Sequence, residues 1–367
     1  MNMNRRSFLI GGSMLTPAVR AAAASGGRIV YTGTYTGPES KGIYMFRFAD
    51  GTASEPELAG EVQNPSFLAI HPNRKLVYSV GEIQGGTVSA FSVDRASGKL
   101  TALNSQPSGG AGPCYVSVDR TGKNVLVANY GGGSVAVLPV DPKDGKLGER
   151  TALVEHKGMG PTKRQDKPYA HCIKLSPDNR FALVADLGID QVLVYRFDPS
   201  AGTLQLSAEA KLKPGAGPRH FAFHPKNRMV YVNGEMDSTV TAYAWDNGTL
   251  LERGVVSTLP ADFKDQNSTA EIVVHPTGKW VYVSNRGHDS IAVFAVERDG
   301  KLSPRGHTPT GGQTPRNFVV DPTGKYLLAA NQKTGNINTF RIDPGQGTLS
   351  AAGSPIRVAS PVCLRFL

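Results

Sequence analysis

The sequence predicts an all-β protein, a seven-bladed β-propeller. One strand pattern recurs along the chain at intervals of about 50 residues, and the two ends of the chain supply complementary parts of one further copy. No segment of helical periodicity separates the repeats, which argues against an α/β fold. The 42 glycines and 25 prolines fit a chain of short strands and tight turns.

Each repeat opens at a small residue or a proline, which we call the anchor. An apolar strand, a turn, a second apolar strand, a polar break and a third, alternating strand follow. The anchors are spaced by 48, 57, 48, 52, 45 and 46 residues, at Pro65, Pro113, Ala170, Pro218, Ala270, Pro315 and Pro361. In five of the six complete repeats the first turn places Pro after His, Asp or Ser, which presets φ for a β-turn. Gly-x-Leu after the third strand usually begins a fourth, so each repeat predicts one propeller blade.

The seventh repeat is divided between the ends of the chain. Residues 361–367 match a first strand, residues 28–36 a second and residues 42–48 a third. We therefore expect the C-terminal strand to pair with the N-terminal strands and close the ring, which leaves no unprotected radial edge.

Residues 1–24 precede the repeats and resemble a twin-arginine export signal. Arg5 and Arg6 stand before a short apolar stretch, residues 8–19, and small residues follow at 21–24. This stretch is too short and weakly apolar for stable membrane insertion. We expect cleavage of residues 1–24, a single propeller domain over residues 25–367, and a periplasmic protein. Loss of three arginines and no acid would lower the net charge from +10 to +7. The basic residues lack the clustering of a nucleic-acid-binding protein.

Three cysteines, Cys114, Cys172 and Cys363, fall on predicted innermost strands, without a CxxC motif or metal-ligand spacing. We expect buried free thiols, no metal and no cofactor. The glycines at 131–133 lie in a turn between strands rather than before a helix, so they do not indicate a nucleotide site. The oligomeric state stays open.

Aligning the repeats gives two rings of positions near one end of the central channel. The first ring, the residue after each anchor, is Ser66, Cys114, His171, Arg219, Glu271, Arg316 and Val362. The second ring, at the end of each second strand, is Tyr35, Glu82, Tyr130, Leu187, Glu235, Arg286 and Gln332. Five polar residues lie beside the rings: Asp186, His220, Asn285, Asn317 and Asn331.

Packing positions keep their chemistry from repeat to repeat, whereas these positions diverge and carry charge. Buried charges must be paired or used, so the rings predict a polar ligand pocket. The alternative is a network of salt bridges between blades that fills the channel. His71, His224 and His275 belong to the turn after the first strand, where we expect a structural role.

The segments AHCIKLSPDNRFALVADL, GPRHFAFHPKNRMVYVNGE, VSNRGHDSIAVF and TPRNFVVDPTGKYLLAANQ resemble the β-propeller lactonase family. That family includes bacterial 6-phosphogluconolactonases and is similar to the fungal carboxymuconate cyclases. The resemblance covers essentially all of residues 28–367. It implies a catalytic set of one His, two Arg and one Glu, which in this chain are His171, Arg219, Glu235 and Arg286.

The implied activity is hydrolysis of a sugar aldonolactone, either 6-phosphogluconolactone or glucono-1,5-lactone. We expect Glu235 to act as general base, with His171 as alternate base or proton shuttle. Arg219 and Arg286 would polarise the lactone carbonyl. The expected substrate-binding residues are Glu271, Arg316, His220, Asp186, Asn285 and Asn331. Two alternatives remain: a lactonising cyclase of the muconate type, and an exported propeller that binds without catalysis.

Overall fold

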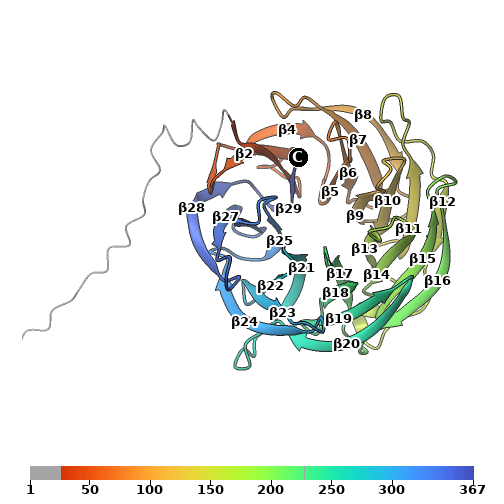
Figure 1. The fold of residues 1–367 in the computed structure, drawn as a ribbon. Coiled ribbons are helices and arrows are strands. Elements are labelled where there is room, and N and C mark those ends of the chain that lie inside the picture. Colours follow the sequence, from red (N-terminus) through yellow and green to blue (C-terminus); the bar gives the residue numbers. More distant parts are fainter. Residues whose placement is uncertain (1–25, 227) are drawn as a thin grey trace, which may run out of the picture.

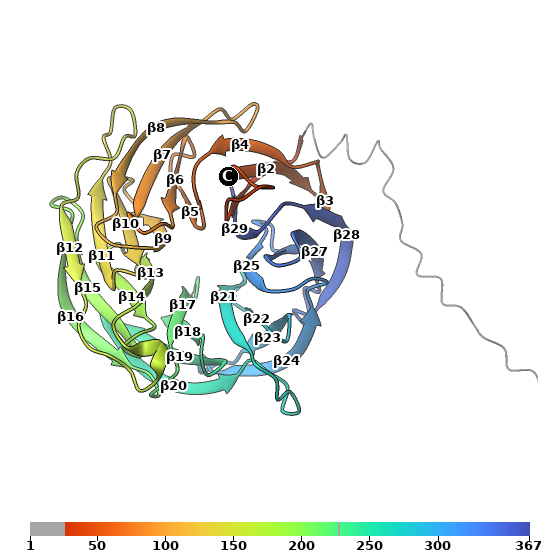
Figure 2. The same cartoon turned by 180° about the vertical axis from the view of Figure 1, so that it is seen from behind.

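Seven antiparallel β-sheets stand in a ring around a central channel in the computed structural model (Figures 1 and 2). The structure describes residues 26–226 and 228–367, so the expected export signal at residues 1–24 lies outside the described residues. The predicted seven-bladed β-propeller is confirmed.

We number the blades in chain order, with the innermost strand of each blade named first. Blade 1 contains β5 (Leu68–Ile70), β6 (Leu76–Gly81), β7 (Thr87–Val93) and β8 (Leu100–Pro107). Blade 2 contains β9 (Pro113–Val118), β10 (Asn124–Asn129), β11 (Ser134–Pro139) and β12 (Ala152–Glu155). Blade 3 contains β13 (Ala170–Leu175), β14 (Phe181–Asp186), β15 (Gln191–Asp198) and β16 (Thr203–Lys211). Blade 4 contains β17 (Pro218–Phe223), β18 (Met229–Gly234), β19 (Thr239–Asp246) and β20 (Thr249–Ser257). Blade 5 contains β21 (Ser268–Val274), β22 (Trp280–Arg286), β23 (Ser290–Val296) and β24 (Leu302–Pro309). Blade 6 contains β25 (Pro315–Val320), β26 (Tyr326–Asn331), β27 (Asn336–Ile342) and β28 (Leu349–Arg357).

Blade 7 joins the two ends of the chain, as the sequence predicted. It contains β29 (Pro361–Phe366), β1 (Arg28–Thr34), β2 (Gly42–Ala49), β3 (Thr52–Ala53) and β4 (Glu57–Glu61). The register pairs Tyr31 with Arg365, and the backbone N–H of Leu367 donates to the carbonyl of Ile29 at 2.9 Å. The ring is therefore closed by hydrogen bonds between the chain ends.

Burial is greatest in the second strand of a blade and falls toward the outer strand. In blade 3 every residue of the second strand, β14, is buried, whereas the outer strand β16 is mostly exposed. The second strands are runs of small and β-branched apolar residues because both of their faces pack against neighbouring blades. The hydrophobic core therefore lies between the blades, and the channel is left to polar groups.

Repeated side-chain contacts join each blade to the next. The Tyr78 hydroxyl donates to the carbonyl of Gly145 in the following blade at 3.0 Å, and Tyr231 does the same to Gly300 at 2.9 Å. The turn histidines also reach a turn glycine of the next blade, over 2.8 to 2.9 Å, as in the pairs His71–Gly122, His224–Gly278 and His275–Gly324. The structural role predicted for these histidines is confirmed.

A β-bulge at the start of the innermost strand turns one side chain out of the sheet. In blade 4, Pro218 pairs with Gly234 and His220 with Asn233, so Arg219 has no partner on β18. Six of the seven innermost strands share this register shift. Bulges often re-aim a side chain next to functional sites. Here the bulge places the residue after the anchor at the channel.

The anchor assigned to blade 5 is wrong by one residue. Thr269 pairs with Asn285, as Pro218 pairs with Gly234 in blade 4, so Thr269 and not Ala270 is the anchor. Glu271 is therefore the second residue after its anchor and is equivalent to His220. Ala270 resembles an anchor in the sequence because anchors are small residues or prolines.

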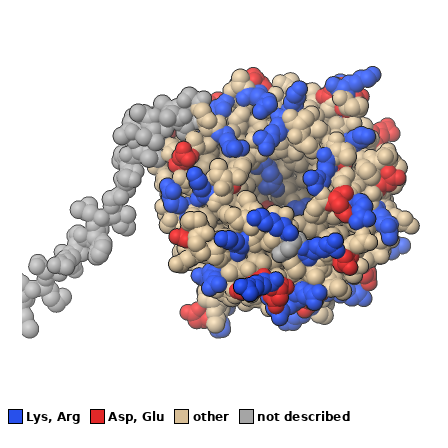
Figure 3. Space-filling view, viewed as in Figure 1, with Lys and Arg blue, Asp and Glu red and all other residues tan. Residues whose placement is uncertain are grey.

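The expected thiols are confirmed, since Cys114, Cys172 and Cys363 are free and buried. Over residues 26–226 and 228–367, no helix is long and apolar enough to cross a membrane. On the face shown in Figure 3 the centre of the molecule is hollowed, and Lys and Arg side chains lie in and around the hollow.

Candidate active site

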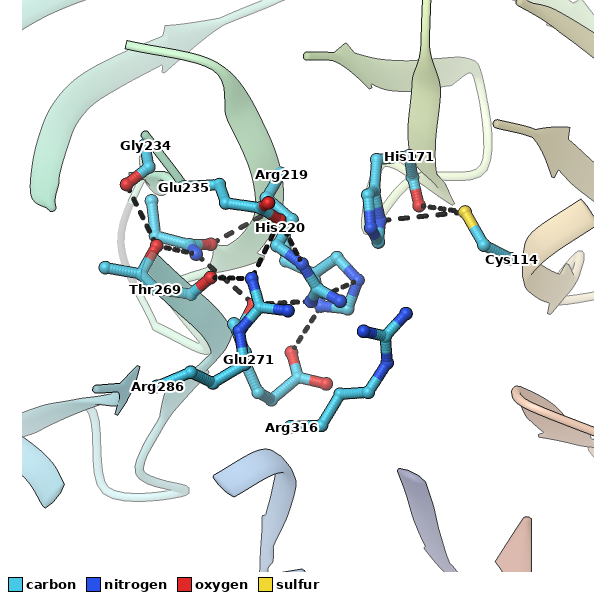
Figure 4. Close-up of polar contacts among 12 residues, drawn as sticks. Cys114, His171, Arg219, His220, Gly234, Glu235, Thr269, Glu271, Arg286 and Arg316 are labelled. Atoms are coloured by element: carbon cyan, nitrogen blue, oxygen red, sulfur yellow. Dashed lines mark hydrogen bonds and ion pairs between the residues drawn. The ribbon is translucent and has the colours of Figure 1, made fainter. Parts of the chain in front are cut away.

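The candidate site lies in the channel at the ends where the innermost strands begin and the second strands finish. Arg219 on β17 and Arg316 on β25 are placed there by bulges. Glu235 directly follows β18, and Arg286 is the last residue of β22. The two predicted rings therefore converge, as Figure 4 shows for the labelled side chains.

Glu235 is held by three guanidinium groups. Its Oε2 lies 2.9 Å from Nε of Arg219 and 2.9 Å from Nη2 of Arg286 (Figure 4). Its Oε1 lies 2.7 Å from Nη2 of Arg164. Burial alone would raise the pKa of Glu235, but the charges of Arg286, Arg219 and Arg164 outweigh burial and lower the pKa far below its ordinary value. The carboxylate stays ionised and has little affinity for a proton.

A second group, His220 with Glu271, lies beside Arg219. His220 Nδ1 is 2.9 Å from Glu271 Oε1, and its Nε2 is 3.2 Å from Nη1 of Arg219. A guanidinium only donates, so Nε2 accepts and Nδ1 carries the proton that binds Glu271. Burial, together with the charge of Arg219, lowers the pKa of His220 to about 3 despite the nearby Glu271. A neutral imidazole thus connects Glu271 to Arg219.

Glu271 is satisfied by neighbours on two blades. Besides His220, the side-chain amide of Asn317 and the backbone N–H of Ile272 donate to it. Burial alone would raise its pKa, but the interactions with His220 and the charges of Lys174 and Arg365 lower it. Glu271 is therefore an ionised group that fixes His220, one layer below Glu235.

His171 faces the channel from the bulge of β13 (Figure 4). Its Nδ1 lies 3.7 Å from Sγ of Cys114, and its ring packs edge-on against Tyr130 at 5.4 Å. Burial, and then the charges of Arg219, His220 and Arg316, hold the pKa of His171 well below its ordinary value. Among the described residues, Nε2 of His171 has no hydrogen-bond partner. The imidazole is neutral and available to accept a proton.

Arg316 forms a separate contact with Tyr35. Its Nη2 donates to the Tyr35 hydroxyl at 2.9 Å, and that hydroxyl donates to Oε2 of Glu82 at 2.9 Å. The guanidinium carbon also lies 5.4 Å from the centre of the Tyr35 ring. Burial is the largest influence on Tyr35 and raises its pKa, so this hydroxyl stays protonated.

Two buried donor groups at the site have no partner among the described residues. They are Nε of Arg286 and the hydroxyl of Ser66. Ser66 lines a small cavity together with Glu82, Cys114, Arg219, His220 and Arg316. Leaving a buried donor unsatisfied costs about 1–3 kcal/mol, so these two donors call for a partner, either a water molecule or a polar atom of a ligand.

Three predicted substrate-binding residues lie outside this arrangement. Asp186 binds Nδ1 of His156 at 2.6 Å and the backbone N–H of Tyr169 at 2.7 Å. Asn285 exchanges two hydrogen bonds of 2.8 Å with Thr258, and Asn331 donates to the carbonyl of Thr310 at 3.2 Å. All three are fully buried and hold loops between strands and blades. Each of the three residues directly precedes a residue of the second ring. Because successive side chains of a strand point to opposite faces, these three point away from the channel.

Arg164 was not predicted from the sequence, and Tyr35, Glu82 and Asn317 were not among the predicted catalytic or substrate-binding residues. Arg164 belongs to a loop that has no counterpart in the other repeats, so repeat alignment has nothing to compare it with. The signal was the 57-residue spacing between Pro113 and Ala170, the longest between anchors. No group of three or more His, Cys, Asp or Glu residues in the described part of the chain could hold a metal ion.

Comparison with known proteins gives a consistent result along the chain. The profile of a family described as "Lactonase, 7-bladed beta-propeller" matches residues 29–366. A Bacillus subtilis protein named 6-phosphogluconolactonase is 42% identical over 345 residues, which cover 92% of this chain and 98% of the relative. A Formosa agariphila protein of the same name is 37% identical over 336 residues, covering 87% and 94%. The solved structure of a periplasmic gluconolactonase from Pseudomonas aeruginosa has a TM-score of 0.89 and 31% identity, covering 93% of this chain and 99% of that one.

Proposed function

Because the chain belongs to the lactonase family of seven-bladed β-propellers, we propose that it hydrolyses a sugar lactone to the open-chain acid. The relatives' names, 6-phosphogluconolactonase and gluconolactonase, support this reaction class. The observation that carries the proposal is the neutral His171 with a free Nε2, set among guanidinium groups in one channel.

In the proposed reaction, His171 is the general base. Nε2 removes a proton from water as the water oxygen bonds to the lactone carbonyl carbon. The negative charge that develops on the carbonyl oxygen is stabilised by Arg219 and Arg286. When the tetrahedral intermediate collapses, the bond from carbon to the ring oxygen breaks and protonated His171 returns the proton to that oxygen. The products are a carboxylic acid and a hydroxyl group.

This proposal gives Glu235 a different role from the one its sequence suggested. Both carboxylate oxygens of Glu235 are paired with guanidinium groups, which also lower its pKa, so neither oxygen is free to accept a proton from water. We assign Glu235 the task of fixing the directions of Arg219 and Arg286. Nε2 of His171, by contrast, has no hydrogen-bond partner among the described residues, and the negative charge that develops on the carbonyl oxygen raises the pKa of His171 during the reaction.

The channel charges also argue against a propeller that only pairs its own side chains. We call the level of the channel at Glu235 the upper channel. Two carboxylates, from Glu82 and Glu235, lie there among four guanidinium groups, from Arg164, Arg219, Arg286 and Arg316. A purely structural network would balance its buried charges. The excess of positive charge instead suits a substrate whose oxygen atoms become negative.

The experiment is a set of lactone assays on purified protein of residues 25–367, with and without a chelator. We expect enzymatic hydrolysis of 6-phosphoglucono-1,5-lactone or glucono-1,5-lactone above the spontaneous rate, measured by acid release in a pH-stat. Rates equal to the spontaneous reaction with every sugar lactone would reject the function. Loss of activity with chelator would reject a mechanism based on side chains alone.

We also propose that the protein is exported to the periplasm by the twin-arginine route. Arg5, Arg6, the apolar residues 8–19 and the small residues 21–24 support this location, as does the likeness to a protein described as periplasmic. Replacing both arginines by lysine should leave the protein in the cytoplasmic fraction and uncleaved. Periplasmic protein of mature size from that variant would contradict the route.

A further inference from the structure

Arg164 stands at the mouth of the site, on a loop rather than on a blade. It belongs to the short 3-10 helix η1 (Lys163–Gln165), between the outer strand of blade 2 and the inner strand of blade 3. Its guanidinium is 2.7 Å from Oε1 of Glu235. The Arg164 side chain is 54% exposed, whereas those of Arg219 and Arg286 are 3% and 13% exposed. Arg164 is thus the outermost of the cations around Glu235.

The loop that carries Arg164 is fixed by the neighbouring residue. Gln165 is fully buried, and its Nε2 donates to the carbonyl of Leu187 at 2.8 Å and to Oδ1 of Asp190 at 2.7 Å. The same Asp190 oxygen accepts the backbone N–H of Gly217 at 2.8 Å, two residues before Arg219. Asp190 therefore joins the base of the Arg164 loop to the strand that carries Arg219, so both guanidinium groups are positioned before a ligand arrives.

The bond to Glu235 leaves much of the Arg164 guanidinium open. An arginine has five N–H donors; the ion pair with Glu235 uses one at Nη2, and a contact with the side chain of Tyr130 uses another. The outer face of the half-exposed side chain meets solvent at the entrance. A guanidinium in this position has the fork geometry that binds phosphate in two hydrogen bonds.

The charge of the site calls for an anionic ligand. Four guanidinium groups face two carboxylates in the upper channel, and a neutral sugar lactone would leave that excess uncompensated. A phosphate monoester at neutral pH carries about two negative charges, which would balance it. A doubly charged group is costly to remove from water, so it is best held at the entrance, where Arg164 lies.

We propose that Arg164 is a specificity-determining residue that binds the phosphoryl group of a phosphorylated sugar lactone. The lactone ring then points inward, with its carbonyl among Arg219 and Arg286 and next to His171. This inference rests on the proposed lactonase function and deepens it. It selects the phosphorylated substrate over the neutral one, which an exported enzyme would otherwise be expected to meet.

The test compares two lactones, 6-phosphoglucono-1,5-lactone and glucono-1,5-lactone, in four proteins. These are the unmodified protein, Arg164→Gln, Arg164→Lys, and the control Lys163→Gln, which removes the same charge from the exposed neighbour. We expect the unmodified protein to prefer the phosphorylated lactone. Arg164→Gln should lower the ratio of the two kcat/KM values by about 10- to 100-fold, chiefly through KM, as for loss of a hydrogen bond between charged groups. Arg164→Lys should fall between, and Lys163→Gln should keep the ratio.

A binding measurement keeps the subsite testable without turnover. Glucose 6-phosphate and glucose are stable rings with and without the phosphoryl group, and calorimetry gives their Kd values. We expect glucose 6-phosphate to bind the unmodified protein and to bind Arg164→Gln about tenfold or more weakly, with Lys163→Gln unchanged.

The outcomes separate this inference from the lactonase function. An unchanged ratio of kcat/KM in Arg164→Gln, or equal loss with both lactones, would overturn the role of Arg164 and leave the lactonase function standing. No hydrolysis of either lactone by the unmodified protein would overturn the function. In that event the phosphoryl subsite still stands or falls on whether glucose 6-phosphate binds in an Arg164-dependent way.

Discussion

Replacing Glu235 by Gln should destabilise the protein because two buried guanidinium groups would lose their counter-charge. Glu235, Arg219 and Arg286 have side chains only 8%, 3% and 13% exposed, so solvent screens them little. Breaking a buried ion pair by removing one partner costs about 3–5 kcal/mol. The pair with Arg164 adds at most about 1 kcal/mol, since that side chain is half exposed. The amide nitrogen of Gln would also face donors.

The assay is thermal unfolding followed by circular dichroism at one scan rate. A loss of about 3–5 kcal/mol in a domain of this size should lower Tm by roughly 4–7 °C. The matched control is Glu252→Gln, on the exposed outer strand of the same blade, which should change Tm by less than about 1 °C. If Glu235→Gln unfolds within about 1 °C of the unmodified protein, the guanidinium cluster does not depend on this carboxylate and the reasoning fails.

The same variant gives a pH signature. The pKa of Glu235 is lower in the folded protein than the unfolded value of about 4.3, because its interactions with Arg286, Arg219 and Arg164 outweigh burial. Stability from the ionised group is therefore fully present above about pH 5 and is lost as the pH falls from the unfolded pKa toward the folded one. The Tm difference between the two proteins should be constant from pH 8 to about pH 5 and should narrow below about pH 4.

Three further predictions concern the channel and the thiols. His171→Asn should lower kcat by about 10²–10⁴-fold. In the unmodified protein, kcat/KM should stay flat from pH 8 to 6.5 because burial lowers the pKa of His171. An acid limb centred at or above pH 6.5 would contradict the assignment of His171 as the base. Glu271→Gln should cost about 1–3 kcal/mol in urea unfolding, since it disturbs the bonds to His220 and Asn317; an unchanged midpoint would show that Glu271 does not order this layer. The three thiols, Cys114, Cys172 and Cys363, should react with a thiol reagent only after denaturation, because burial raises the pKa of each; fewer than three equivalents without reductant would reveal a disulfide.

Repeat alignment could predict the blades and most of the channel residues because each blade repeats one register. Arg219 and Glu235 diverge from their counterparts in other repeats, and the structure brings them to 2.9 Å. The shift of Glu271 by one position was detectable in the sequence, because the anchor lies six residues before the turn in Pro218–His224 and in Pro315–Asp321 but only five residues before it in Ala270–His275. Ala270 resembles an anchor because it is small, but the spacing to the turn and the pairing of Thr269 with Asn285 both identify Thr269 as the anchor.

The sequence could not separate residues that face the channel from residues that brace it. Asp186 and Asn331 are the last residues of their second strands, one position before the ring that contains Glu235. Asp186 accepts the backbone N–H of Tyr169, and Asn331 donates to the backbone carbonyl of Thr310. Polarity alone does not reveal on which side of a strand end a side chain lies. Arg164 shows the opposite limit, since a loop without a repeat counterpart offers no periodicity, and the contact with Glu235 exists only in three dimensions.

The divided seventh blade has a consequence for how the protein is made. Residues 28–49 are synthesised early, yet their innermost neighbour is residues 361–366, more than 300 residues later. Until that last strand leaves the ribosome, β1 exposes an unpaired edge to other nascent chains, and the Arg316–Tyr35 contact across this seam cannot form. Acquisition of the native activity should therefore wait for this final pairing, and early termination anywhere before residue 361 should yield an aggregation-prone chain rather than a smaller working ring.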